Sequence, residues 1–318
     1  MKILIATGLE KSDIGGPFQY AHNLKAEFEK LGNKVKVAKY GSIEGTFLGI
    51  WPHAVWADKI LALDTFSVGV PAVLAGKLLG KKTIVRVCGD FLWSAYVNRT
   101  GVSITLPEFY KSMPALNTKE KIIFHLYRWA IRNAGFLAFN TEWQRSIWEK
   151  TYDISYVKSG VVRNFIPARH KIGESANPDS GKNFLWAGRV IPEKNPGMLR
   201  SLGVDIVTGE AHARVLEKIK NSYAVTSLAF TDICPNFVIE GISFGKPFVM
   251  TRETGLDEIF PKGGIFVDPL DEKQIKEAMQ SLRDENTYNK YTDGIKSLNL
   301  SHSWARMAEE FLSIWKKI

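Results

Sequence analysis

Two cations of this 318-residue chain have a spacing that suits phosphate chemistry. Arg189 and Lys194 lie five positions apart in the segment 188–196, between an apolar stretch that predicts a strand and a stretch that predicts a helix. Backbone N–H groups and the helix dipole favour negative charge at a helix N-terminus, so two added cations there suit a diphosphate. The alternative interpretation is a solvated loop with ordinary surface charges.

A pair of carboxylates forms a second candidate site. Asp232 precedes an expected helix, and Glu240 lies eight residues later, about two helical turns further on. Each carboxylate could bind vicinal hydroxyls, one pair on a ribose and one pair on a sugar. The alternative makes Asp232 a helix N-cap, a position that Asp favours, and Glu240 a surface residue. Apolar neighbours of Glu240 argue against a surface position: Val238, Ile239 and Ile242.

Parallel α/β sheets would position these side chains. Short apolar segments alternate with helical periodicity in both halves of the chain, which predicts two doubly wound parallel sheets. In such sheets ligands bind at the carboxyl ends of the strands, where Arg189 and Lys194 emerge. We expect strands at 2–7, 35–37, 59–63, 83–87, 136–139, 184–187, 204–207, 223–228, 247–250 and 265–267, helices at 17–31, 70–79, 119–134 and 303–318, and irregular structure at 91–118.

Composition restricts the class of protein. A hydrophobic content of 45% with 24% charged residues argues against disorder. No apolar run reaches the roughly 18 residues of a membrane span, and the first residues lack the pattern of a signal peptide. Two cysteines, Cys88 and Cys234, suit a reducing compartment. We expect a cytoplasmic protein without a metal site, in which the six scattered histidines have structural or surface roles.

The positive charge is concentrated in the first half of the chain. Residues 1–160 carry 21 Lys and Arg against 13 Asp and Glu, whereas residues 161–318 carry 21 against 20. An anionic partner should therefore meet the first half. Dispersed basic residues and the lack of a recognition motif argue against nucleic acid. The amphipathic stretch 119–134 is either a helix packed on the core or a surface for anionic membranes.

Taken together, the motifs resemble those of the retaining GT-B glycosyltransferases of family 4, the glycosyltransferase group 1 enzymes. The resemblance covers nearly the whole chain. Its motifs are a glycine loop, a basic pair, an acidic pair, a turn and a strand end: Gly15-Gly16, Arg189 with Lys194, Asp232 with Glu240, 255–258 and 267–270.

The resemblance implies an α/β fold of the GT-B type, with two Rossmann-like domains facing each other across a cleft. Residues 1–162 would form the acceptor-side domain, and residues 163–302 a compact domain that binds the nucleotide sugar. The expected last helix, 303–318, has an apolar face and would pack back on the first domain.

The resemblance also implies roles for individual residues. Arg189 and Lys194 would hold the diphosphate leaving group, and Glu240 would bind the ribose hydroxyls. Asp232 would lie beside the donor sugar. The backbone at Asn236 and Phe237 would approach the hydroxyls of the sugar. The backbone N–H groups of Gly15 and Gly16 would approach the β-phosphate.

Two positions depart from the family pattern. Asp232 stands where the family has Glu, so its carboxylate is one methylene shorter. Many members have a His-containing segment after the fourth strand, where this chain reads Val-Cys-Gly-Asp-Phe-Leu-Trp at 87–93. We expect Asp90 to be the catalytic group there, with Cys88 as an acceptor-side residue and Trp93 as a stacking surface.

The expected activity is retaining transfer of a hexose from a UDP- or GDP-linked donor to a glycan or lipid-linked acceptor in polysaccharide or glycoconjugate biosynthesis. By resemblance it needs no metal and no further cofactor, because Arg and Lys stabilise the leaving group. The enzyme would act in the cytoplasm, at the inner face of the membrane if the acceptor is a lipid. The alternatives are another GT-B enzyme, such as an epimerase or a phosphorylase, and a degenerate nucleotide-sugar-binding protein.

Overall fold

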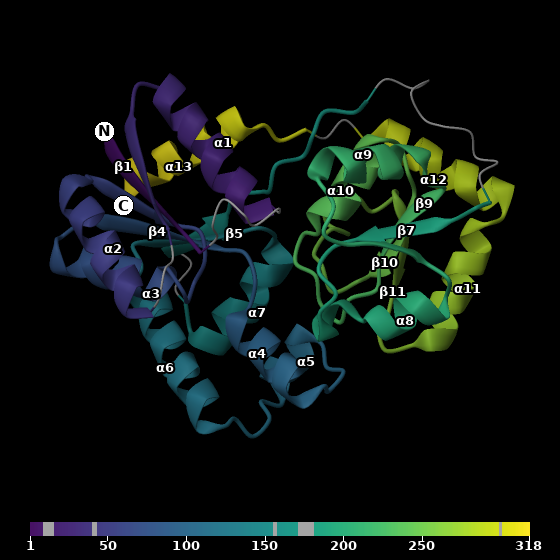
Figure 1. Ribbon diagram of the computed structural model, residues 1–318, viewed down its shortest axis with the longest axis horizontal. Coiled ribbons are helices and arrows are strands. Elements are labelled where there is room, and N and C mark those ends of the chain that lie inside the picture. The colour runs from purple at the N-terminus through teal and green to yellow at the C-terminus, as the bar shows by residue number, and fades with distance from the viewer. Residues whose placement is uncertain (9–15, 40–42, 155–157, 171–180, 299–300) are drawn as a thin grey trace. The chain divides into compact units, whose positions relative to one another are not determined.

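The computed structural model shown in Figure 1 describes residues 1–8, 16–39, 43–154, 158–170, 181–298 and 301–318. The chain divides into two compact units, each built on its own parallel sheet. Unit 1 comprises Met1–Tyr96, Ser112–Arg163 and Ser303–Ile318, and unit 2 comprises Val97–Lys111 and Asn164–His302. The two predicted parallel α/β sheets are thereby confirmed.

The sheet of unit 1 has the order β2-β1-β3-β4-β5-β6. All neighbouring strands are parallel. Its strands are β1 (Lys2–Thr7), β2 (Lys34–Lys39), β3 (Lys59–Ala62), β4 (Lys82–Val87), β5 (Phe136–Phe139) and β6 (Ser159–Val161). The interior of β1 is fully buried, as its uninterrupted apolar run requires in a sheet covered on both faces.

The helices of unit 1 follow the strands in alternation. They are α1 (Gly16–Lys30), α2 (Ile43–Trp56), α3 (Gly69–Leu78), α6 (Thr118–Asn133), α7 (Glu142–Tyr152) and α13 (Trp304–Lys317). The N-terminus of α6 has a capping box, in which the side chains of Asn117 and Glu120 each bind the other's backbone N–H. Sequence periodicity located this helix to within one residue at each end.

The last helix, α13, packs on the first helix, α1. The rings of Tyr20 and Trp304 meet edge to face with their centroids 5.2 Å apart, and those of Phe28 and Trp315 lie 5.9 Å apart. Phe28 is fully buried by this packing. The apolar face of the C-terminal helix is therefore covered by an element from the other end of the chain.

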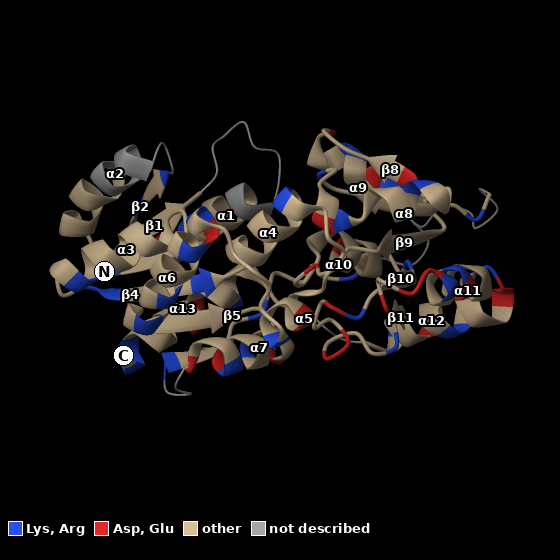
Figure 2. Ribbon diagram, turned by 90° about the horizontal axis from the view of Figure 1, so that it is seen from below, with Lys and Arg blue, Asp and Glu red and all other residues tan. Residues whose placement is uncertain are grey.

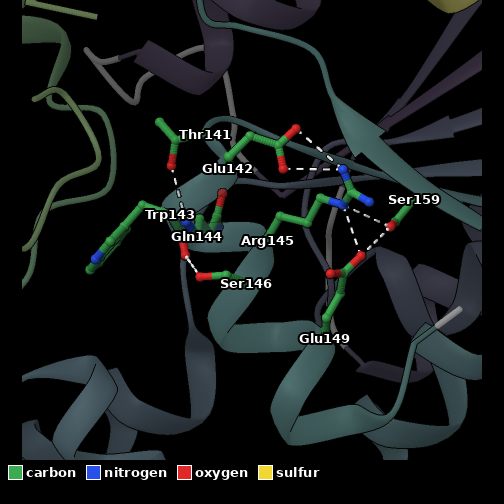
Figure 3. A network of polar contacts seen from close by, with 8 residues as sticks. All are labelled: Thr141, Glu142, Trp143, Gln144, Arg145, Ser146, Glu149 and Ser159. Atoms are coloured by element: carbon green, nitrogen blue, oxygen red, sulfur yellow. Dashed lines mark hydrogen bonds and ion pairs between the residues drawn. The ribbon is translucent and has the colours of Figure 1, made fainter. Parts of the chain in front are cut away.

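A buried polar network fixes α7 to β6, as Figure 3 shows. The Arg145 guanidinium donates from Nε to Glu149 at 2.8 Å and to the Ser159 hydroxyl at 3.1 Å, and from Nη1 to Glu142 at 3.1 Å. The Thr141 hydroxyl caps the same helix by accepting the N–H of the third helical residue at 3.1 Å. Arg145 thus joins two turns of a helix to a neighbouring strand.

The interval 91–118 is not irregular, so that prediction was wrong. It contains α4 (Phe91–Thr100) and α5 (Leu106–Lys111). Asp90 Oδ1 accepts the N–H of Trp93 at 2.8 Å and so caps α4, a signal that the density of aromatic residues obscured. Residues 97–111 belong to unit 2, where the Leu106 N–H donates to Thr231 Oγ1 at 2.9 Å.

Unit 2 contains a five-stranded sheet in the order β11-β10-β9-β7-β8, with all neighbours parallel. Its strands are β7 (Phe184–Ala187), β8 (Asp205–Val207), β9 (Ala224–Ser227), β10 (Phe248–Thr251) and β11 (Gly264–Val267). Relative to chain order the sheet reads 2-1-3-4-5, which reverses direction between β7 and β9. Such a reversal opens a crevice beyond the carboxyl ends of the strands.

Helices cover both faces of this sheet, as Figure 1 shows for α9 and α10 on one face and α8 and α11 on the other. Each face has its own apolar core. The helices are α8 (Pro196–Ser201), α9 (His212–Asn221), α10 (Asn236–Ser243), α11 (Glu272–Leu282) and α12 (Glu285–Ser297), and a 3₁₀ turn, η2, spans Pro192–Lys194.

The long segment of unit 2 begins and ends at neighbouring points. Ile166 and His302 form an antiparallel bridge, in which each N–H donates to the other's carbonyl, at 3.0 and 3.1 Å. His302 Nδ1 also lies 3.1 Å from the Asn164 carbonyl. The chain therefore enters and leaves this segment side by side.

Candidate functional site

The predicted donor-side residues of unit 2 lie where its strand order reverses. Arg189 follows the end of β7 by two residues, and Lys194 is the last residue of η2. Asp232 comes from the loop after β9, the strand on the other side of the reversal. Two basic side chains and one acidic side chain thus occupy the carboxyl edge at which open α/β sheets bind ligands.

Lys194 and Asp232 form a direct ion pair, with Nζ 2.5 Å from Oδ1. The Ser227 hydroxyl donates to the second oxygen, Oδ2, at 3.1 Å. The side chains of the ion pair are 23% and 16% exposed, so neither is an ordinary surface charge. A phosphate bound here by Lys194 would share its ammonium group with a fixed carboxylate.

Two backbone hydrogen bonds join the Asp232 loop to the loop after β10. The Asp232 N–H donates to the Glu253 carbonyl at 3.0 Å, and the Cys234 N–H donates to the Thr254 carbonyl at 3.2 Å. Pro235 is the N-cap of α10, and no side chain caps that helix. The interpretation of Asp232 as a helix cap is therefore excluded.

The first turn of α10 carries the predicted backbone-binding positions. Asn236 is its first residue, and its side-chain oxygen accepts from the Asn164 amide at 3.2 Å, while Phe237 is half-buried. Because no side chain among the described residues caps α10, its first N–H groups can bind a ligand. Just before the helix, Cys234 has a φ of 52°, a left-handed conformation unusual for a residue with a Cβ.

The Arg189 side chain is exposed. Within the described parts of the chain it makes no hydrogen bond or ion pair, so its guanidinium is available to an anion. The preceding residue, Gly188, packs against Trp186, and a Cβ there would come within 2.9 Å of the indole ring. Glycine at 188 thus allows the chain to turn out of β7 over this ring.

Glu240 is paired with a residue that the sequence analysis did not select. Its Oε1 lies 2.8 Å from Nε2 of His212, the first residue of α9. This hydrogen bond raises the pKa of His212, against the opposing effect of burial. His212 and Glu240 are 28 positions apart, and nothing in the sequence links them, so this pair could not be predicted.

Glu253 is a second residue that sequence reasoning missed. Burial raises its pKa to about 7, the carboxylates of Asp268, Glu108 and Asp257 add to the increase, and Arg252 opposes it. Its Oε2 is buried and has no hydrogen-bond partner among the described residues. Figure 2 shows acidic residues gathered on the loops after β10 and β11. The available signal was an acidic residue two positions after an apolar strand.

The predicted acceptor-side residues follow β4 in unit 1. Asp90 is 5% exposed and serves as the cap of α4. Trp93 is also 5% exposed, so no ring face is open for the predicted stacking, which would need this side chain to leave its packed position. Cys88 is a partly exposed free cysteine, and burial of its thiol raises its pKa. These three residues are neighbours, but two of them have clear structural roles.

The predicted glycine loop is described only in part. Gly15 lies outside the described residues, and Gly16 is the first residue of α1. In the described ranges, no three residues of the types His, Cys, Asp and Glu are grouped so as to hold a metal ion. Of the helices that the structure describes, none combines the length and the apolar character that crossing a membrane requires.

A cavity of about 630 Å³ lies elsewhere in unit 2. The cavity lies along β8, which pairs only with β7 among the described strands. Charged residues such as Asp205, Arg214 and Lys218 line it. None of the predicted site residues lines it. The candidate site is therefore defined by the strand reversal and by the Lys194–Asp232 pair.

The sequence matches no protein-family model and no curated protein. Solved structures match it along its length. HepE of Anabaena in complex with UDP-glucose has a TM-score of 0.72 at 11% identity, covering 100% of both chains. Sucrose-phosphate synthase from Thermosynechococcus elongatus has a TM-score of 0.69 at 11% identity, covering 99% of this chain and 98% of that chain.

A third similar structure is WaaG, a glycosyltransferase involved in lipopolysaccharide biosynthesis. Its TM-score is 0.70 at 11% identity, and 99% of each chain is covered. At such low identity these likenesses establish the fold alone. The predicted GT-B class, with two Rossmann-like α/β domains, is confirmed.

Proposed function

We propose that this protein is a glycosyltransferase that moves a sugar from a nucleoside diphosphate to an acceptor, and that unit 2 binds the donor. The observation that carries the proposal is the Lys194–Asp232 ion pair at the carboxyl edge of a sheet whose strand order reverses, the edge at which Arg189 follows β7. The similar fold of HepE, whose structure contains UDP-glucose, supports a nucleotide-sugar donor.

The proposed chemistry follows from the charge of the leaving group. Departure of the nucleoside diphosphate develops negative charge, which Arg189 and Lys194 stabilise from fixed positions. The Asp232 carboxylate orients Lys194 through their 2.5 Å contact, and it lies beside the donor sugar. Since these cations neutralise the diphosphate, we propose transfer without a metal or a further cofactor, with retention at the anomeric carbon as in the family that the motifs resemble.

The remaining donor-side residues bind the rest of the nucleotide sugar in this proposal. The open N–H groups at Asn236 and Phe237 approach the sugar hydroxyls. Glu240 accepts hydrogen bonds from the ribose hydroxyls. The acceptor is a glycan or a lipid-linked sugar, and the residues after β4 contribute to its site.

Substitution of the cations tests the proposal. In Arg189→Ala and Lys194→Ala, we expect the rate of sugar transfer or donor hydrolysis to fall on the order of 10²–10³-fold, because one electrostatic contact to the leaving group is lost. The measurement is release of UDP or GDP from a panel of donor sugars. Arg200→Ala is the matched control, because Arg200 is an exposed residue on α8 of the same unit.

Three results would contradict the proposal. Full activity in Arg189→Ala would remove the leaving-group role. A nucleotide diphosphate that raises the melting temperature without any turnover would indicate a nucleotide-sugar-binding protein instead. A rearranged nucleotide sugar as the product would indicate an epimerase.

We also propose that unit 1 contacts anionic membranes through α6. Ile122 and Leu126 are 55% and 40% exposed on this helix, while Ile123 and Tyr127 face the core. Lys121, on the exposed side, adds positive charge beside the two apolar side chains. Exposed apolar residues flanked by lysine are the pattern of a helix that lies on a lipid surface. Such a contact would bring the enzyme to a lipid-linked acceptor.

A further inference from the structure

Glu240 and His212 come from two helices that pack together, α10 and α9. The 2.8 Å contact uses Oε1 of Glu240, and Oε2 makes no hydrogen bond to a described residue. The side chains are 21% and 39% exposed, for Glu240 and His212 respectively. The pair is therefore open to a ligand on one side.

A purely structural role explains this pair poorly. Ion pairs with this degree of exposure stabilise a fold by roughly 0–1 kcal/mol. A protonated imidazole at the first position of α9 is also unfavourable for that helix, since its dipole disfavours positive charge at the N-terminus. What the contact does achieve is to fix the direction of a partly buried carboxylate on α10.

We propose that His212 is a positioning residue of the donor site, which orients the Glu240 carboxylate so that its remaining lone pairs accept hydrogen bonds from the ribose hydroxyls. This inference rests on the proposed function, in which Glu240 is the ribose-binding group. The proposal adds His212, which lies outside the acidic motif, to the donor site. Nucleotide binding would then depend on the protonation of the His212 imidazole.

The expected pH dependence follows from the groups around His212. Glu240, on α10, is the charged group that faces it, and its hydrogen bond raises the pKa of His212. Glu210, which precedes α9, is bound to Lys218 at 2.5 Å. Below the raised pKa the imidazolium holds Glu240 by a charge-assisted hydrogen bond. Above it the neutral imidazole still donates to the carboxylate, but the attraction between opposite charges is lost, so the contact is weaker.

The test compares nucleotides with and without ribose hydroxyls. The probe is UDP or GDP, whichever raises the melting temperature of the wild-type protein, and its 2′,3′-dideoxy analogue. At pH 6 we expect His212→Ala to weaken binding of the ribonucleotide about tenfold, because a charge-assisted hydrogen bond is lost. Binding of the dideoxy analogue should change less than about twofold. A merely structural histidine would weaken both ligands equally.

His212→Gln is the matched variant, because a glutamine amide can donate to Glu240 but does not titrate. We expect it to bind the ribonucleotide at pH 8.5 as the wild type does. The gain in affinity that the wild type shows on acidification to pH 6 should be absent. Melting temperatures of all variants without ligand control for loss of the fold.

The outcomes separate this inference from the proposed function. If Arg189→Ala abolishes nucleotide binding while His212→Ala leaves it unchanged, the role of His212 is refuted and the proposed function stands. Equal loss for both nucleotides in His212→Ala also refutes the positioning role. If the wild type binds neither UDP nor GDP between pH 6 and 8.5, both proposals fail together.

Discussion

The carboxylate of Asp232 has a partner for each of its oxygens, and only one of these interactions involves a residue that the sequence pattern selected. Lys194 belongs to the basic motif, whereas Ser227 is the last residue of β9 and has no motif of its own. The candidate cations and acids could be chosen from the sequence, because each motif is local and sits at the end of an expected strand. Their partners come from other segments, and the fold alone brings them together.

His212 and Glu253 mark the limit of sequence reasoning at the residue scale. His212 matters because α9 and α10 place it against Glu240, and Glu253 because burial among other carboxylates changes its protonation. The predicted acceptor-side residues show a second limit, because the sequence does not reveal which side chains are needed for packing or capping. The sequence suggests chemical roles for Trp93 and Asp90, but it does not show that Trp93 is buried or that Asp90 caps α4.

The raised pKa of Glu253 predicts a pH-dependent stability. The folded protein keeps a proton on this carboxyl up to about pH 7, whereas the unfolded chain releases it near the ordinary value of 4.5. The stabilising contribution is therefore complete below about pH 4.5 and is lost as the pH rises through 7. In Glu253→Gln, which does not ionise, we expect greater stability than wild type at pH 8.5, by on the order of 2 kcal/mol, and little difference at pH 5.

Urea unfolding at the two pH values measures this difference. Glu217→Gln is the control, since Glu217 is an exposed residue of α9 in the same unit. The control should follow the wild type at both pH values. A constant difference between Glu253→Gln and wild type across this range would contradict the assigned protonation.

At the scale of elements, local signals predicted most strands and helices. Uninterrupted apolar runs located β1, β5 and β7 to the residue, because a strand buried on both faces needs such a run. One strand of only three residues, β6 (Ser159–Val161), was missed since it has no apolar run and depends on pairing with β5. α4 was missed because its cap is a single aspartate in an aromatic segment.

The Arg145 network predicts how strongly α7 is held. The side chains of Arg145 and Glu149 are only 11% and 12% exposed, so removing the cation leaves a largely buried carboxylate with the Ser159 hydroxyl as donor but without its countercharge. We expect Arg145→Met to lower the free energy of unfolding by about 2 to 3 kcal/mol. The measurement is the midpoint of urea unfolding, followed by a probe in unit 1.

A nearby ion pair serves as the comparison for this prediction. Arg132 and Asp153 are 45% and 92% exposed, at a distance of 3.3 Å. Because water screens exposed pairs, Arg132→Met should cost less than about 0.5 kcal/mol. Equal effects of the two substitutions would show that burial does not decide the strength of the Arg145 network.

On the scale of the whole molecule, alternation of strands and helices predicted two parallel sheets, and the structure has them. The assignment of 97–111 to unit 2 could not be predicted, since it depends on tertiary contacts such as the hydrogen bond from Leu106 to Thr231. The uneven distribution of charge was visible in the sequence, but which apolar residues of α6 remain exposed was not.

The exposed side of α6 predicts binding to anionic vesicles. We expect the wild type to float with vesicles that contain phosphatidylglycerol, and its bound fraction to rise with the anionic lipid content. Ile122→Glu together with Leu126→Glu should abolish this binding, since the two exposed apolar side chains are replaced by negative charge. Val55→Glu is the control, an equally exposed apolar residue on α2. Flotation that is independent of lipid charge would refute the membrane contact.

The bridge between Ile166 and His302 has a consequence for how the gene could be rearranged. The ends of this long segment are hydrogen-bonded to each other, as in a domain inserted into another domain. If the segment were replaced, α13 could still pack on α1. Domain insertion is tolerated where the ends of the inserted piece are close together. Recombination could thus exchange residues 164–302 as one piece, with a second exchange of the short stretch 97–111 to complete unit 2.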